Sequence, residues 1–317
     1  MNKLKLMASL FAAVVLAAGL SAQTLDEVNT KFNEAGAKLQ AKDFVGAIPL
    51  LEDVIKQGGE VGADAAETVT QAQKFLPVAY YQVGGGMAAQ SKFDEAVAAL
   101  TKARDLGELY GNVQVSRGAA QMIGKVYFAQ GASAYNADDY AKAIEIFSKG
   151  YEADPTNTDM AMNLARSYDK SGELEKAVEV YQGVIGLESR HSRYAEPAAE
   201  AKNELAIAVL AKASEASDWE DVVRLTDMVL SVDPQNEMAN LMRLQIANNL
   251  KNYRAVTEYG DAAAEAQTDP EKKSDAYFLL GAAYQNLDNK AKAIEALRKV
   301  TAGSNVAAAR KLISDLQ

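Results

Sequence analysis

The chain has 317 residues, of which 49% are hydrophobic and 24% charged, and it contains no Cys and only one His. The absence of thiols excludes disulfides, Cys nucleophiles and thiolate metal sites, and a single imidazole leaves no His pair for a metal. A net charge of -10 without any run of Lys or Arg disfavours nucleic-acid binding. Roughly a fifth of the residues are Ala, the strongest helix former, so we predict an all-α protein without catalytic residues, metal or cofactor.

Residues 1–22 have the layout of a secretory signal peptide. Lys3 and Lys5 form a short positive segment, an apolar run follows from 6 to 20, and small residues precede Gln23. We predict cleavage between Ala22 and Gln23 and export to the periplasm or cell envelope. The alternative is an uncleaved membrane anchor, because the apolar run is only just long enough to cross a bilayer.

A short pattern recurs seven times along the rest of the chain. Its best copy, at 139–144, reads Asp-Tyr-Ala-Lys-Ala-Ile, and each copy places a small residue four positions after its polar start. Consecutive small residues lie 49, 47, 34, 45, 34 and 37 positions apart, so the base period is 34. The small residues are Ala47, Ala96, Ala143, Ala177, Val222, Val256 and Ala293.

Apolar residues at helical spacing flank each small residue. In the third copy, Phe147 and Gly150 follow Ala143 by four and seven positions, which places all three on one face of a helix. In five copies another compact residue lies twelve positions before the small one, which predicts a preceding helix that its partner approaches closely. Each copy is therefore predicted to be a helical hairpin. The compact residues of the first helices are Ala35, Gly84, Gly131, Ala165 and Gly281.

This order of small, aromatic and proline residues resembles the tetratricopeptide repeat family, of which the chain looks like an exported bacterial member. The resemblance implies a right-handed superhelical solenoid of helix-turn-helix hairpins over residues 23–305, with a capping helix at 306–317. Segments 62–76, 111–123 and 192–202 account for the long spacings and are predicted to be helical extensions. The seven predicted repeats are 28–61, 77–110, 124–157, 158–191, 203–236, 237–270 and 274–307.

Four residues depart from the family pattern. Lys38 and Ala213 replace the usual aromatic residue of the first helix, and Thr226 and Gly260 replace the large apolar residue of the second. Trp219 occupies the aromatic position that follows the turn, so we predict that it belongs to the core.

Other candidate motifs have structural explanations. Gly84 begins a run of three glycines, but no strand precedes it and no phosphate-loop lysine follows, so close helix packing is the better interpretation. Asp139 and Asn289 are predicted to cap helices and not to bind calcium. His191 is predicted to be exposed between repeats.

A partner surface is what remains. In the tetratricopeptide repeat family the first helices line a concave groove, and the resemblance carries ten residues of this chain into it. Their aromatic and amide side chains suit an extended peptide or a partner helix. The alternative is that the aromatic residues do no more than fill gaps between repeats. The predicted groove residues are Phe32, Asn33, Tyr81, Gln82, Lys125, Phe128, Tyr135, Met162, Asn163 and Arg166.

We therefore predict a non-catalytic protein-interaction scaffold of the bacterial cell envelope, with an unidentified protein partner, no nucleic acid and no stable membrane insertion after signal cleavage. The alternative is a carbohydrate-binding component of an outer-membrane uptake system, although the lipoprotein Cys and the large insertions usual in such proteins are missing here.

Overall fold

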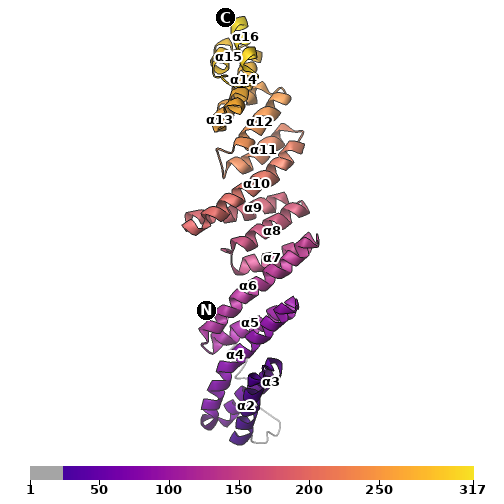
Figure 1. The fold of residues 1–317 in the computed structure, drawn as a ribbon, viewed down its shortest axis with the longest axis vertical. Helices are drawn as coiled ribbons and strands as arrows, with labels where there is room; N and C mark the ends of the chain where they lie inside the picture. Colours follow the sequence, from indigo (N-terminus) through magenta and orange to yellow (C-terminus); the bar gives the residue numbers. More distant parts are fainter. Residues whose placement is uncertain (1–23) are drawn as a thin grey trace. The chain divides into compact units, whose positions relative to one another are not determined.

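The structure, a computed structural model, describes residues 24–317 (Figure 1). The proposed signal peptide and its cleavage site lie outside these residues. The described chain forms two compact units, unit 1 up to Gln130 and unit 2 from Gly131 onwards, with the boundary inside helix α6. Residues 24–317 are helical and contain no strand, which confirms the all-α prediction. Among them, no helix is both long and apolar enough to span a bilayer.

Unit 1 is a series of helices in which each contacts the next. Its first hairpin pairs α2 with α3, and a short 3₁₀ turn then leads into the long helix α4, which pairs with α5. The predicted extension 62–76 is thus largely helical, as is most of 111–123, which opens α6. The elements are α2 (Leu25–Gln40), α3 (Phe44–Val61), η1 (Ala63–Ala65), α4 (Ala66–Ala89), α5 (Phe93–Leu109) and the first part of α6 (Val113–Asn136).

Unit 2 continues the same alternation of first and second helices. Consecutive helices from α7 to α16 contact each other, and α10, α12 and α14 also contact one another in sequence. The predicted extension 192–202 forms a short 3₁₀ helix and the start of α10, and the predicted capping helix is α16. After the end of α6 come α7 (Tyr140–Ala153), α8 (Thr158–Ser171), α9 (Leu174–Gly186), η2 (Leu187–Ser189), η3 (Ser192–Tyr194), α10 (Ala195–Glu215), α11 (Trp219–Leu230), α12 (Glu237–Asn249), α13 (Tyr253–Ala266), α14 (Pro270–Asn286), α15 (Lys290–Arg298) and α16 (Val306–Leu316).

The small residues of the repeat are buried at the helix contacts. All seven small residues of the second helices have no exposed surface. In the first helices, a Cβ added at Gly84 would lie 2.6 Å from Cγ of Leu100, and one added at Gly131 would lie 2.6 Å from the ring of Phe147. The small residues that recur in the sequence therefore mark the places where two helix backbones lie close together.

The turns of the hairpins share one backbone device. Six of the seven carry a residue in the left-handed conformation, and in each the next N–H donates to a carbonyl five residues back, 2.8–3.0 Å away. In the turn of Asp138, this donor is Asp139, whose carboxylate also accepts a hydrogen bond from Lys142 N–H at 3.1 Å. Asp139 and Asn289 cap their helices as predicted. The left-handed residues are Lys42, Ser91, Asp138, Gly172, Lys251 and Asp288.

The α10–α11 hairpin lacks this turn. No residue between Glu215 and Trp219 has a positive φ, and Asp218 makes no side-chain capping bond. Trp219 is only partly buried, which corrects its predicted place in the core: it packs against the edge of a core cluster, with its ring centroid 6.2 Å from that of Tyr259 in α13. Trp219 is the first residue of α11, so its ring lies at the end of the helix and outside the fully buried interior.

Candidate protein-binding face

The predicted groove residues fall into both units, so they do not form one described site. Unit 1 contains Phe32 and Asn33 of α2, Tyr81 and Gln82 of α4, and Lys125 and Phe128 of α6. Tyr135, Met162, Asn163 and Arg166 belong to unit 2.

In unit 1, the predicted groove residues of each first helix are adjacent or three positions apart, so they lie on one face of that helix. α2 contacts α4, and α6 lies against α4 where the Tyr81 ring is 3.6 Å from the Cβ position of Gly118. We define the unit 1 face as Asn29, Phe32, Asn33, Gly36, Val78, Tyr81, Gln82, Gly85, Lys125, Phe128 and Ala129. Lys125 is the one charged residue in this set.

The aromatic rings of the unit 1 face are anchored in the core and partly open to solvent. Phe32 packs on the α2–α4 core and lies 6.4 Å from the Phe75 ring, centroid to centroid. Tyr81 packs on the α4–α6 core, and Phe128 is 37% exposed. Beside the rings, the amides of Asn33 and Gln82 are exposed. The rings therefore fill gaps between helices and also leave apolar surface for a partner.

Two glycines of the unit 1 face are not explained by packing within the chain. A Cβ added at Gly36 or Gly85 would have no atom within 4 Å, whereas Gly84, one residue away, is tightly enclosed. A glycine inside a helix costs about 1 kcal/mol relative to Ala. Gly36 and Gly85 each follow an aromatic residue by four positions, so bare backbone lies one turn beyond the ring of Phe32 and of Tyr81.

The four groove residues of unit 2 are mostly engaged within the chain. Tyr135 stacks edge-on against Tyr140, with centroids 5.4 Å apart, and Asn163 donates to the carbonyl of Asp159 at 2.8 Å. Met162 is buried, with 4% of its area exposed, so its predicted place on an open groove is wrong. The reason is that α8 is packed among three other helices, α7, α9 and α10.

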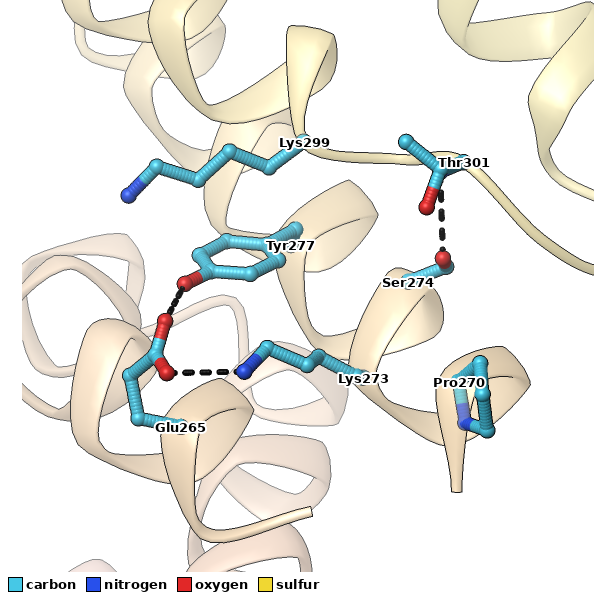
Figure 2. A pocket seen from close by; sticks show the side chains of 7 residues that line it. All are labelled: Glu265, Pro270, Lys273, Ser274, Tyr277, Lys299 and Thr301. Carbon is cyan, nitrogen blue, oxygen red and sulfur yellow. Dashed lines mark hydrogen bonds and ion pairs between the residues drawn. The ribbon is translucent and has the colours of Figure 1, made fainter. Parts of the chain in front are cut away.

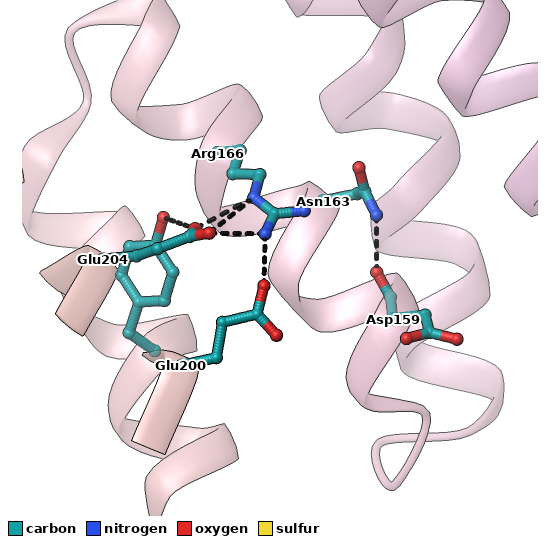
Figure 3. Close-up of polar contacts among 6 residues, drawn as sticks. Asp159, Asn163, Arg166, Glu200 and Glu204 are labelled. Carbon is teal, nitrogen blue, oxygen red and sulfur yellow. Dashed lines mark hydrogen bonds and ion pairs between the residues drawn. The ribbon is translucent and has the colours of Figure 1, made fainter. Parts of the chain in front are cut away.

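Arg166 of α8 forms a charged cluster with α10 (Figure 3). Its Nε lies 2.9 Å from Oε2 of Glu204, and a terminal nitrogen lies 2.8 Å from Oε1 of Glu200. The buried hydroxyl of Tyr181 donates to Glu204 at 3.0 Å. The hydrogen bond to Glu204 raises the pKa of Arg166, and burial, with Glu204 nearby, raises the pKa of Tyr181. The cluster joins α8, α9 and α10 and leaves an excess of negative charge.

A small pocket of about 260 Å³ lies between α13, α14 and the end of α15 (Figure 2). Its charges are already paired: Lys273 Nζ is 2.7 Å from Glu265, the Tyr277 hydroxyl also donates to Glu265, and Lys299 lies over the Tyr277 ring. The hydrogen bond from Lys273 lowers the pKa of Glu265. Residues 24–317 contain no group of three or more acidic or His side chains that could hold a metal. His191 is exposed, as predicted.

Sequence reasoning missed a second surface, on α10, α12 and α14 of unit 2. Ile207 is 60% exposed and Met238 is 61% exposed, although both lie on first helices that pack together. Applying the groove positions of the first four copies to the last three would have identified them.

The alternating helices and the closed small positions define a helical-repeat protein. Residues 134–202 and 274–302 match the tetratricopeptide repeat family. The chain therefore carries tetratricopeptide repeats, and proteins built from such repeats are generally non-catalytic scaffolds for protein partners.

Several known proteins are similar to parts of the chain. The photosystem I assembly protein Ycf3 of Synechococcus sp. (strain CC9902) is 42% identical over 63 residues, which is 19% of this chain and 36% of that protein. The chain therefore spans about a third of the length of this curated relative. A MamA crystal structure is 19% identical, covering 56% of this chain and 89% of that one, with a TM-score of 0.32. A tetratricopeptide repeat protein from Parabacteroides merdae ATCC 43184 is 14% identical, covering 92% and 99%, with a TM-score of 0.27.

Proposed function

We propose that the protein is a non-catalytic scaffold of the cell envelope whose unit 1 face binds an extended, largely uncharged peptide segment of a protein partner. The observation that carries this proposal is the pairing of half-buried aromatic rings with unfilled backbone at Gly36 and Gly85. Anchored rings lose little freedom on binding, and exposed amides such as Asn33 and Gln82 can bond a peptide backbone. An almost uncharged face on an acidic chain suits a ligand without charge.

A direct test is to fill the two glycine positions. The double variant Gly36→Gln/Gly85→Gln should unfold at slightly higher denaturant, because each change removes a helix-interior glycine and gains about 0.5 kcal/mol. The same side chains would project over the unit 1 face and block it. We expect proteins that crosslink to the wild type in intact envelopes, quantified by mass spectrometry, to be lost from the variant.

The matched control is Gly59→Gln/Gly86→Gln, at two exposed helical glycines that also have no atom within 4 Å of an added Cβ but lie off the unit 1 face. It should show the same gain in stability and keep the crosslinked partners. Retention of every partner by the Gly36/Gly85 variant would exclude this face as the binding site.

A carbohydrate is the second candidate ligand, because exposed rings next to amides can also stack and bond a sugar. Oligosaccharide binding that is saturable, and lost in the Gly36→Gln/Gly85→Gln variant, would favour this alternative over a peptide.

Location in the envelope rests on the signal-like segment at 1–22. We expect the purified native protein to begin near Gln23 and to fractionate with soluble envelope contents. Recovery of Met1 on membrane-bound protein by terminal sequencing would contradict this expectation.

A further inference from the structure

An apolar stripe runs over three first helices of unit 2. Its residues lie on α10, α12 and α14, at the same repeat positions as the predicted groove residues of the first four copies. α10 contacts α12, and α12 contacts α14. Ile207 and Met238 are about three-fifths exposed. Leu241, Phe278 and Leu279 pack on the core beneath and stay partly open, and Met242 is also partly exposed. Isolated exposed apolar residues are normal, but a contiguous set marks an interaction surface. The apolar stripe is Ile207, Met238, Leu241, Met242, Phe278 and Leu279.

Negative charge lies at one edge of the apolar stripe on its two outer helices, α10 and α14. Glu200 and Glu204 lie on α10, two turns and one turn before Ile207, and they share a single cation, Arg166 (Figure 3). On α14, Glu271 and Asp275 precede Phe278 at the same helical spacing. The side chain of Glu200 is 53% exposed, so this acidic edge is open to solvent. At the opposite edge, Ala211, Gln245 and Ala282 carry no charge.

We propose that the apolar stripe binds an amphipathic helix of a partner protein that carries Lys or Arg along one side of its apolar face. The acidic edge provides the charge complementarity, and the uncharged opposite edge fixes the orientation of the helix. Packed helices lie about 8–10 Å apart, so three first helices span about 20 Å, the length of about 13 helical residues. Met238 and Met242 can adapt to different apolar side chains.

This surface is separate from the proposed peptide site of unit 1. No residue of the unit 1 face belongs to the apolar stripe, and the Gly36→Gln/Gly85→Gln variant should leave helix binding unchanged. The two proposals can therefore fail independently.

The test uses two synthetic helical peptides of 16 residues with the same Leu face, one flanked by Lys on one side and one flanked by Glu at the same positions. Binding to the purified protein is measured by fluorescence anisotropy in 150 mM salt. We expect the Lys peptide to bind at least ten-fold more tightly than the Glu peptide.

Two variants locate the binding. Ile207→Ser/Met238→Ser removes exposed apolar surface without opening the core and should weaken the Lys peptide at least ten-fold. Glu200→Lys/Glu271→Lys should abolish the preference for Lys over Glu. The controls are Leu250→Ser/Leu287→Ser, at exposed apolar turn residues, and Glu179→Lys/Glu220→Lys, at exposed positions of second helices with the same change in net charge.

Both controls should bind the Lys peptide within about two-fold of the wild type. The proposal is overturned if neither peptide binds saturably, if the Ile207/Met238 variant binds as the wild type does, or if the charge control loses the preference as fully as the edge variant. The last result would mean that the peptide senses only the overall negative charge of the protein.

Discussion

Replacing Arg243 by Ala should destabilise unit 2 by about 3 kcal/mol, because it removes a buried cation that joins three helices. The Arg243 side chain of α12 is 6% exposed. Its Nε donates to Oγ1 of Thr226 at 2.7 Å, it is ion-paired with Asp227, and its guanidinium lies 4.8 Å from the centroid of the Tyr259 ring. Loss of these contacts leaves a cavity and unpaired acceptors in α11.

Urea unfolding followed by circular dichroism measures this loss. The control is Arg224→Ala in α11, whose side chain is 49% exposed and makes only surface ion pairs, so its expected cost is below about 1 kcal/mol. A double change, Arg243→Met with Thr226→Val, should recover much of the stability, because apolar residues can replace a buried polar pair that is removed as a whole. Equal effects of Arg243→Ala and Arg224→Ala would show that the buried contacts contribute nothing special.

Adjacent glycines of α4 should respond in opposite directions to the same change. Gly84→Ala should cost about 1 to 3 kcal/mol, because the new methyl group would lie 2.6 Å from Cγ and 3.1 Å from the backbone nitrogen of Leu100, which is fully buried. Gly85→Ala should instead stabilise the protein by about 0.5 to 1 kcal/mol, because Ala favours the helical conformation more than Gly does and the new methyl group displaces no neighbouring atom.

Thermal unfolding of the two single variants measures both signs. If both substitutions stabilised the protein, α4 and α5 would lie farther apart than the structure places them. If both destabilised it, Gly85 would need a structural explanation in place of the binding role proposed for it.

The sequence predicted the helical hairpins because their main determinant is local and periodic. A small residue such as Ala143 recurs with the period of the fold, and its burial follows from helix geometry alone. The turn chemistry was also readable at Asp139, since a short acidic side chain before an apolar period is a capping signal.

The sequence could not predict where a residue of one hairpin fills the place left by an unusual residue in another hairpin. Thr226 and Gly260 looked like defects in the repeat, but Arg243 bonds to the first, and Leu280 of α14 packs within 2.7 Å of the Cβ position of the second. These partners are 17 and 20 positions away, and no periodic rule links them.

The predicted groove residues were less accurate than the predicted fold, because they too depend on contacts between distant parts of the sequence. The repeat register assigns Met162 to an open position, but exposure depends on all the neighbouring helices, and α8 contacts α7, α9 and α10. The same register placed Phe32 and Tyr81 on the first-helix face, yet whether such rings pack or bind cannot follow from periodicity, which is identical for both roles.

The missing turn between α10 and α11 has a consequence for how the protein folds. In the other hairpins a backbone hydrogen bond closes the turn, so each turn can form before the neighbouring hairpins have folded. α11 packs on α10 and α12, and side chains tie it further to its C-terminal side: Arg243 of α12 bonds to Thr226, and Trp219 contacts Tyr259 of α13. In a linear array, a unit with weak intrinsic stability folds on a neighbour that is already ordered. Folding of unit 2 should thus nucleate on either side of this hairpin and reach it last, with α12 and α13 as its template.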